Sequence, residues 1–331
     1  MKQEFLQLAH TYKASKHPIY NAYMSEKLDG MRCFWDGGIS IGHRKGSIHW
    51  ANVLNPEHIC TGLWSRYGNV IHAPAWWTDK MPSMMLDGEL YNKAWTRQKL
   101  MEVIKPYNPG PEWDQVDFFA FDCPTSVIFK RRMIDNPNFK KYITEEAMAF
   151  FESKKHLLAF LPPVGTNYRE IVMDYLIYVK NTGVEIVQQH QVYSIEDTVS
   201  FLDEIISRGG EGIMLRMPGS VYVTERTHTL LKIKPFLDAE GTVVGYVGGK
   251  GKLENMVGAV ILDYKGKRLE MSGFTDAERL LSVPTYAPGE DIPEHVTCHA
   301  FPRGTFVTFR YQTLSKDGIP QNASYWRKYN D

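Results

Sequence analysis

The stretch Ser25-Glu26-Lys27-Leu28-Asp29-Gly30-Met31-Arg32 decides how the first part of the chain folds. An aromatic and apolar run, Ile19 to Met24, precedes it. Residues 31–36 follow with the alternation of a half-buried strand, in which Met31, Cys33 and Trp35 share one face. Asp29-Gly30 between the two runs is typical of a hairpin turn. The pattern predicts a hairpin that holds Lys27 at the mouth of a sheet.

A lysine in such a place is a candidate nucleophile. A free amine at its ordinary pKa is protonated and inert, whereas burial or a cationic neighbour favours the neutral form. The neutral amine can then attack a phosphorus or carbonyl centre. The alternative is a surface hairpin in which Lys27 and the acids on either side of it are only solvated.

Composition indicates a globular protein without an overall charge that would attract a nucleic acid. The 331 residues suggest two domains and allow a sizeable core. Hydrophobic residues make up 43% and charged residues 23% of the chain, and its formal net charge is +0. If DNA is a partner, the positive charge that binds it must be local.

The sequence indicates neither a metal module nor an exported or membrane protein. Cys33, Cys60, Cys123 and Cys298 lie far apart and include no C-x-x-C pair, which argues against a zinc site or a disulfide framework. The segment 1–16 lacks the apolar core of a signal peptide, and no later run approaches transmembrane length. We expect a cytoplasmic protein.

Several further elements of the first domain carry polar groups. Phe5 to Ala14 fits a short amphipathic helix, and Ile39 to Trp50 fits a strand pair whose turn contains Arg44. Met84 to Leu90 reads as a strand that carries Asp87 and Glu89 at its edge. Val116 to Asp122 reads as another, in which Phe119 and Phe121 share a face and serve either as core or as a platform for a base.

The segment after residue 122 is rich in basic residues and helix signals. Lys130-Arg131-Arg132 with Lys140-Lys141 fits a phosphate-contact patch or a solvated helix face. Helices are expected near residues 145–155 and 168–180, and a strand over Val184 to Val192. A further helix runs to Ile206 and begins at a capping box, Ser194 with Asp197 three residues on.

Two strands complete the first domain. Glu211 stands at the head of one of them, and Lys232 and Lys234 share a face of the other. Two lysines so close repel each other, which favours an anion between them; a solvated edge is the alternative.

Past a hinge at Pro235 to Asp238 the chain changes to short strands punctuated by glycine. Such a pattern predicts a small β-barrel of the OB kind. We therefore expect an α+β protein with domains at residues 1–236 and 237–331.

Lys27, Glu89, the aromatic pair, Glu211 and the two lysines occur in this order at predicted strand ends and faces. Together they suit nucleotidyl transfer. A lysine would attack the α-phosphate of a nucleoside triphosphate, carboxylates would hold a divalent metal, and further lysines would orient the phosphates.

The motifs that carry this set resemble those of the ATP-dependent DNA ligases, in the minimal two-domain form of small bacterial and phage enzymes. They are Lys27-x-Asp29-Gly30 with Arg32, Asp87-Gly88-Glu89, Phe121-Asp122, Glu211-Gly212, Lys232-x-Lys234, Gly249-Lys250-Gly251-Lys252 and Ser272-Gly273-Phe274-Thr275-Asp276. The resemblance implies a nucleotidyltransferase (ATP-grasp-like) domain of antiparallel sheets with helices, followed by an OB-fold domain.

The resemblance also implies the reaction. Lys27 takes AMP from ATP, AMP passes to the 5′-phosphate at a nick, and the 3′-hydroxyl then attacks and expels AMP. Glu89 would contact the ribose, Phe121 would stack on adenine, and Glu211, with Glu89, would bind the metal. The remaining nucleotide or phosphate contacts implied are Ser25, Glu26, Arg32, Arg44, Lys232 and Lys234.

The partners implied are ATP, Mg²⁺ or Mn²⁺, and nicked duplex DNA met during repair, replication or recombination, with the protein acting as a monomer. DNA contacts would come from Lys130, Arg131, Arg132, Lys250, Lys252 and Arg327. The chain departs from the family pattern at His43-Arg44, usually Ser-Arg, and at Pro320-Gln321-Asn322, usually Pro-Arg-Phe. The second departure puts the role of Arg327 in doubt.

Three alternatives stay open. An mRNA capping guanylyltransferase shares the lysine motif but typically has Asp-Gly in place of Glu211-Gly212. An RNA ligase differs in sugar preference, which the sequence does not reveal. A non-catalytic single-strand-binding OB protein would use stacked aromatics and lysines without needing Lys27.

Overall fold

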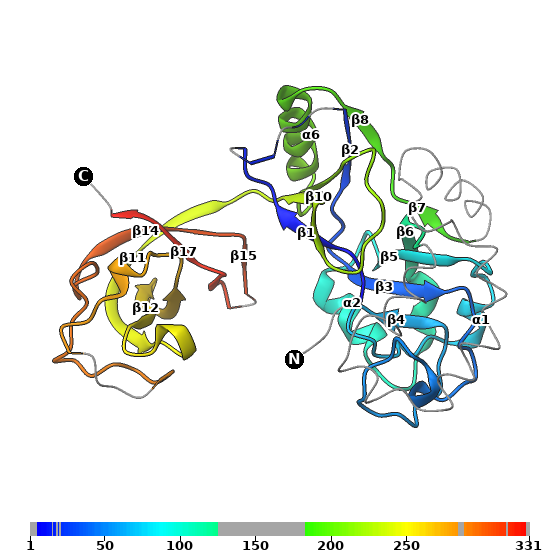
Figure 1. Ribbon diagram of the computed structural model, residues 1–331, viewed down its shortest axis with the longest axis horizontal. Coiled ribbons are helices and arrows are strands. Elements are labelled where there is room, and N and C mark those ends of the chain that lie inside the picture. The colour runs from blue at the N-terminus through cyan, green and yellow to red at the C-terminus, as the bar shows by residue number, and fades with distance from the viewer. Residues whose placement is uncertain are drawn as a thin grey trace. The chain divides into compact units, whose positions relative to one another are not determined.

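The computed structural model describes residues 5–14, 16–17, 19, 21–124, 183–283, 288–315 and 317–328. For residues 327 and 328 it describes the backbone alone. The chain divides into two compact units, Met1–Ile233 and Lys234–Asp331. The expected boundary, between residues 236 and 237, falls three residues further on. Figure 1 draws the first unit from blue to yellow-green and the second from yellow to red. The helices expected near 145–155 and 168–180 lie outside the described residues.

The first sheet of unit 1 carries Lys27 at the end of a strand. Its order is β1-β10-β9-β2-β8, with β1 parallel to β10 and the other neighbours antiparallel. Helix α6 (Ile195–Ser207) packs Phe201 against a small core on one face of this sheet. The strands are β1 (Leu8–Thr11), β2 (Ala22–Glu26), β8 (His190–Val192), β9 (Ile213–Arg216) and β10 (Arg226–Ile233).

The second sheet of unit 1 has the order β4-β3-β5-β6-β7. One face builds the main core, to which Cys33, Trp35 and Phe118 contribute and which α1 (Ala75–Thr78) and α2 (Arg97–Ile104) cover. Arg32 and Glu89 belong to the opposite face, because side chains alternate along a strand. The strands are β3 (Met31–Asp36), β4 (Leu63–Ser65), β5 (Met85–Tyr91), β6 (Asp117–Asp122) and β7 (Glu185–Ile186).

The predicted hairpin at Asp29-Gly30 is wrong, because β2 and β3 belong to different sheets. Leu28 to Gly30 instead crosses from one sheet to the other. A Cβ on Gly30 would collide with the carbonyl oxygen of Leu90 and lie 2.7 Å from Cγ of Glu89, so the crossing needs glycine. The turn signal is local, whereas the partners of both strands come from distant parts of the chain.

Strand β3 is also more deeply buried than its alternation predicted. Cys33 to Asp36 are buried on both faces. Phe34 enters a second core with Phe5, Trp50 and Trp64, while Cys33 and Trp35 enter the main one. A strand between two cores differs from a half-buried strand in tertiary packing, which its own pattern does not encode.

Three other expectations fail for related reasons. Phe5 to Ala14 is no helix but contains β1, whose parallel partner β10 lies more than two hundred residues along the chain. Val184 to Val192 holds two short strands, β7 and β8, which pair in different sheets. Ile39 to Trp50 has no strand pair among its residues, only a single bridge from Arg44 to Ile59 and a short 3₁₀ turn, Lys45–Ser47.

The capping box is confirmed. Ser194 Oγ accepts from the Asp197 backbone N–H at 3.1 Å, and the Asp197 carboxylate accepts from the Ser194 N–H at 3.1 Å. The helix ends at Ser207, and Gly209 follows two residues on with a φ of +83°, which suits a glycine. This signal succeeds because both partners lie within one turn.

Unit 2 is an OB-like sheet around one core. Its order is β13-β12-β11-β14-β17, all antiparallel, and β15 (Thr313–Leu314) pairs with β16 (Pro320–Gln321). A single bridge, Ser272 to Ser324, joins the two edge strands, so the ladders among the described residues do not close a barrel. The strands are β11 (Leu237–Gly248), β12 (Val257–Tyr264), β13 (Lys267–Met271), β14 (Phe306–Tyr311) and β17 (Ser324–Lys328).

Candidate active site

Lys27 lies directly after β2 and contacts Glu211, which comes two residues before β9. The backbone N–H of Lys27 donates to Gly212 O at 2.8 Å, so the pairing of β2 with β9 continues past the strand ends. Lys27 Nζ forms an ion pair with Glu211 Oε2, and the two side chains are 25% and 21% exposed. The amine is therefore held against a carboxylate while it stays accessible to a substrate.

Arg32, Glu89 and Phe119 stand in one row across the second sheet. Arg32 pairs with Glu89 between β3 and β5, and Glu89 pairs with Phe119 between β5 and β6. Residues directly opposite in an antiparallel pair share a face. The row lies on the face turned away from the main core.

Asp87 is the anchor of this face. Its buried carboxylate receives two hydrogen bonds from Arg32, one of them from Nε at 2.6 Å, and one from the Tyr222 hydroxyl at 2.6 Å. Desolvation alone would lower the pKa of Arg32, but the charge and hydrogen bonds of Asp87 outweigh it and the pKa is raised. Arg32 thus remains a fixed cation.

Phe121 lies beside Arg32 because β6 has a bulge. The register shifts between Asp87 and Gly88, so that Asp87 pairs with Asp122 and Gly88 with Ala120. The Arg32 guanidinium carbon stands 4.7 Å from the centroid of the Phe121 ring. Bulges commonly redirect a side chain next to a functional site, and this one puts an aromatic face next to a cation.

Glu89 is electrostatically coupled to both sheets. Burial raises its pKa to about 7, Lys27 and Arg32 oppose the rise, and Glu211 and Asp87 add to it. The side chains of β2, β9 and β5 therefore meet at one site. A carboxyl whose pKa lies near neutrality suits a place where a cation or a hydroxyl is to be bound.

The other nucleotide-site candidates of unit 1 divide into two groups. Ser25 and Lys232 both pair with Met214, so they share the Lys27 face of the first sheet. Glu26 alternates to the other face, where its carboxylate accepts from Arg208 at 2.7 Å. The ion pair gives Glu26 a structural partner at the end of α6.

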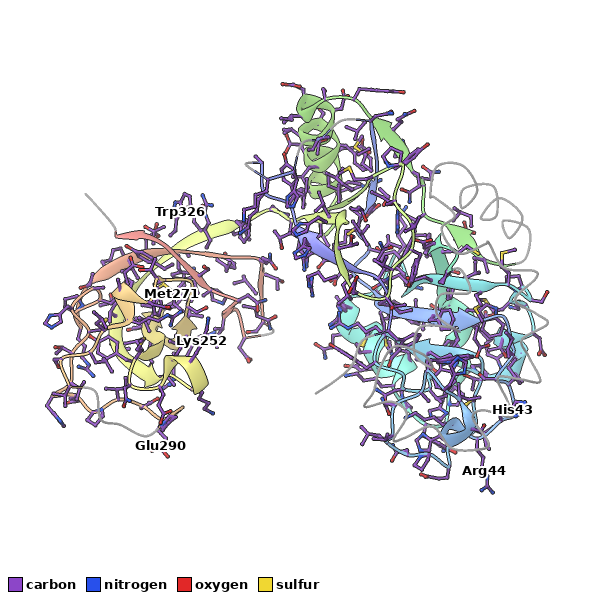
Figure 2. The ribbon with its side chains drawn as sticks, viewed as in Figure 1. His43, Arg44, Lys252, Met271, Glu290 and Trp326 are labelled. Atoms are coloured by element: carbon purple, nitrogen blue, oxygen red, sulfur yellow. The ribbon has the colours of Figure 1, made fainter. Side chains whose placement is uncertain are left out.

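Arg44 is not brought to this group. It is exposed and lies at the lower end of unit 1 in Figure 2, whereas β2 runs along the upper part in the same view. Its predicted phosphate contact stays a prediction.

Candidates elsewhere in the chain are described only in part. Lys234 is the first residue of unit 2, in which Lys250 and Lys252 are exposed. Figure 2 labels Lys252. Arg327 pairs with Thr308 in β17. Lys130, Arg131 and Arg132 lie outside the described residues.

Sequence reasoning gave no role to four residues that hold the site together. Tyr222 donates to Asp87, and Gln7 accepts from Arg32 through its backbone carbonyl and from Arg216 through its side chain. Arg216 pairs with Asp122 at 2.7 Å and so ties the first sheet to the second. The sequence motif Phe121-Asp122 includes Asp122, whereas no motif or pattern in the sequence singles out Gln7 or Tyr222.

No helix among the described residues is long and apolar enough to cross a membrane. The four cysteines are buried free thiols.

A lysine and a carboxylate at adjacent strand ends, facing an arginine, a second carboxylate and an aromatic ring, define a nucleotidyltransferase site, here followed by an OB-like domain. Residues 159–234 match the ATP dependent DNA ligase domain and residues 248–328 the DNA ligase OB-like domain. A DNA ligase of Haemophilus influenzae is 26% identical over 98% of this chain and 91% of its own.

Solved structures agree with the sequence matches. A structure of the Lig E DNA ligases superposes with a TM-score of 0.61 at 26% identity, covering 98% of both chains. A second, Pmar-Lig_Pre., has a TM-score of 0.59 at 20% identity over 98% of this chain and 67% of its own, and supports the fold alone. Together these matches support a minimal ATP-dependent DNA ligase.

Proposed function

We propose that this ligase seals nicks in duplex DNA through an AMP adduct on Lys27. The observation that carries the proposal is the contact of Lys27 with Glu211, set opposite Arg32, Glu89 and Phe121. Of the lysines named above, Lys27 alone combines a strand-end position, an ion pair with a carboxylate and an electrostatic interaction with Glu89.

In the first step the Lys27 amine attacks the α-phosphorus of ATP. The N–P bond forms as the bond from phosphorus to the pyrophosphate oxygen breaks, and the proton of the ammonium passes to solvent, to which the side chain is 25% exposed. Arg32 and Lys232 would offset the charge that develops on the phosphate oxygens. Glu89 would accept from a ribose hydroxyl and Phe121 would stack on the adenine.

Glu211 and Glu89 are the residues that would hold Mg²⁺, since carboxylate oxygens suit this ion. The donor set fits, because the carboxylates of Glu89 and Glu211 lie close enough to interact electrostatically. When bound, the ion would offset the charge of the triphosphate.

The next two steps use the DNA ends. The 5′-phosphate of the nick attacks the adenylate phosphorus and releases Lys27 as an amine. The 3′-hydroxyl then attacks the activated 5′-phosphate, forms the phosphodiester and expels AMP. Arg44 and the exposed lysines of unit 2 are the residues we assign to the DNA phosphates, and the protein would act as a monomer.

The deciding experiment is the intact mass of the protein after incubation with Mg²⁺ and either ATP or GTP. Pyrophosphate pretreatment removes any adduct formed during expression. We expect a mass increase of one AMP with ATP, its loss in Lys27→Ala, and its retention in Lys99→Ala, a matched change of an exposed lysine on α2.

A GMP adduct would assign the protein to capping, and no adduct with either nucleotide would remove the covalent mechanism. Nicked DNA and nicked RNA substrates then separate a DNA ligase from an RNA ligase.

A further inference from the structure

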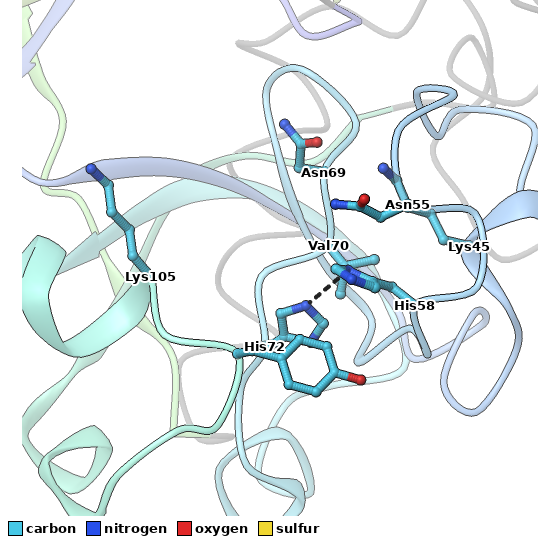
Figure 3. A pocket seen from close by; sticks show the side chains of 8 residues that line it. Lys45, Asn55, His58, Asn69, Val70, His72 and Lys105 are labelled. Atoms are coloured by element: carbon cyan, nitrogen blue, oxygen red, sulfur yellow. Dashed lines mark hydrogen bonds between the residues drawn. The ribbon is translucent and has the colours of Figure 1, made fainter.

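A polar cavity lies in unit 1, apart from the Lys27 site. It has a volume of about 210 Å³ and is lined by the loop between Lys45 and His72 and by the segment that follows α2. Figure 3 shows Lys45 and Asn55 on one side, the pair of His58 and His72 in the middle and Lys105 on the other side. None of these residues belongs to the Lys27 site.

Lys45 brings a positive charge into the protein beside this cavity. Its side chain is buried, and Nζ donates to Asn52 Oδ1 at 2.6 Å and to Leu54 O. Both acceptors are neutral, and an ammonium has three donors, so these bonds use two of them. Burial lowers the pKa of Lys45, as expected for a cation that forms no ion pair with a carboxylate of the described residues.

His58, His72 and Tyr107 form one aromatic group in the cavity. His72 Nε2 and His58 Nδ1 are 3.3 Å apart, and the Tyr107 ring lies 4.4 Å from the His72 centroid and 5.1 Å from that of His58. Burial lowers the pKa of His72, and the neighbouring His58 and Lys45 lower it further. The surroundings thus disfavour the protonated form of His72, and a bound anion would favour it.

Lys45 and Lys105 both line the cavity, and no described residue of its lining carries a carboxylate. Glu57 does not line the cavity, but its charge raises the pKa of Lys45 and so partly opposes the effect of burial. Asn55 and Asn69 add side-chain amides. Residues with ammonium, imidazole and amide groups therefore line a space whose described lining includes no acid.

We propose that this cavity binds a phosphate group through Lys45, Lys105, His58 and His72. Donors on several sides suit a tetrahedral oxyanion better than a planar carboxylate, and lysine binds phosphate well as a point charge. The phosphate comes either from the DNA backbone, since exposed Arg44 directly precedes Lys45, or from a free phosphate or pyrophosphate. Binding does not depend on the chemistry of Lys27.

The test is a titration of the full chain with inorganic phosphate, followed by NMR on the imidazole signals of His58 and His72. We expect both rings to shift toward their protonated positions and to saturate in the millimolar range. Lys105→Glu should weaken binding about tenfold, equivalent to about 1.4 kcal/mol. Lys99→Glu, the same change at an exposed lysine outside the cavity, should not. Lys27→Ala should leave the titration unchanged, so its outcome is independent of ligase activity.

Imidazole signals that stay fixed, or equal effects of Lys105→Glu and Lys99→Glu, would overturn the proposal. Affinity for nicked DNA distinguishes the two sources of phosphate. A loss of affinity in Lys105→Glu alone would assign the cavity to the DNA backbone. Unchanged DNA affinity with a lost phosphate response would assign it to a free phosphate.

Discussion

At the scale of single residues, the site depends on a few buried charges that hold one another. Asp87 fixes Arg32 with two hydrogen bonds and is itself fixed by Tyr222. Glu89, next along the same face, receives no such pair of hydrogen bonds from the part of the chain that the structure describes, and burial raises its pKa to about 7. The two carboxylates, two residues apart, therefore differ in environment. Asp87 positions the Arg32 cation, whereas Glu89 is the carboxylate that we propose binds a ligand.

The raised pKa of Glu89 makes stability depend on pH. Between about pH 4.5, its ordinary value, and pH 7 the folded protein keeps a proton that the unfolded chain has lost, so stability falls as pH rises through this window. Glu89→Gln should therefore be more stable than wild type above pH 7, by at most about 3 kcal/mol, and equal to it below pH 4.5. Denaturant unfolding across this range measures the difference.

Glu102→Gln, at an exposed carboxylate on α2, is the control and should show no such pH dependence. Equal pH profiles for Glu89→Gln and wild type would contradict the assignment.

Tyr222 should act on the reaction through Arg32. Its buried hydroxyl donates to Asp87 and accepts from the Gln7 backbone N–H at 3.1 Å. Tyr222→Phe removes the acceptor of the Gln7 N–H and one of the three donors to Asp87, which keeps Arg32, and should cost about 1–3 kcal/mol. We expect slower formation of the AMP adduct at saturating ATP as well. Tyr246→Phe removes a similar bond, to Phe301 O at 2.7 Å in unit 2, and should lower stability without slowing the adduct. Equal adduct rates in the two variants would remove the positioning role.

The sequence identified most chemical groups of the site but not their supports. Lys27, Arg32, Glu89, Phe121 and Glu211 are recognisable because their side-chain types suit the proposed nucleotidyl transfer and recur in short motifs along the chain. Gln7 and Tyr222 act through a backbone carbonyl and a phenol on distant segments. Such contacts form only when the two sheets pack together, so no local sequence pattern predicts them.

At the scale of elements, Gly30 governs the crossing between the two sheets. In Gly30→Ala the new methyl group would collide with the Leu90 carbonyl and press on Glu89. Overpacking of this kind costs about 1–3 kcal/mol, and here it would also displace a site residue. We expect lower thermal stability and a weaker AMP adduct. Gly219→Ala meets nothing within 4 Å and should be neutral or stabilising by up to about 1 kcal/mol; similar losses in both variants would argue against a packing cause.

Signals from residues close together in the sequence predicted an element correctly where its partners are also close. The predictions were wrong where a strand pairs with a distant segment. The Ser194 capping box places α6 correctly because its partners lie three residues apart. Asp29-Gly30 signals a turn, but the strands on either side pair with β9 and β5 instead of with each other. Phe5 to Ala14 fits a helical period, yet pairing with β10 makes its centre a strand.

At the scale of the whole molecule, net charge and binding must be considered separately. The chain carries 38 basic and 38 acidic residues, so its overall field gives DNA no attraction. Charge is instead distributed locally, as with exposed Lys250 and Lys252 in unit 2. Affinity of this chain for DNA phosphates would have to come from such places.

Affinity for nicked DNA should therefore fall steeply with salt despite the zero net charge. Each phosphate neutralised by a lysine or arginine releases counterions and adds about 0.9 to the slope of log affinity against log salt concentration. The double change Lys250→Ala and Lys252→Ala should reduce that slope by about 2. Lys265→Ala, at an exposed turn whose lysine lies over the Tyr264 ring, should leave it unchanged. Fluorescence anisotropy with nicked duplex at several salt concentrations measures the slopes. A flat dependence for the wild type would mean that shape and hydrogen bonding, not phosphate charge, hold the DNA, and equal slopes for all variants would place the phosphate contacts outside these two lysines.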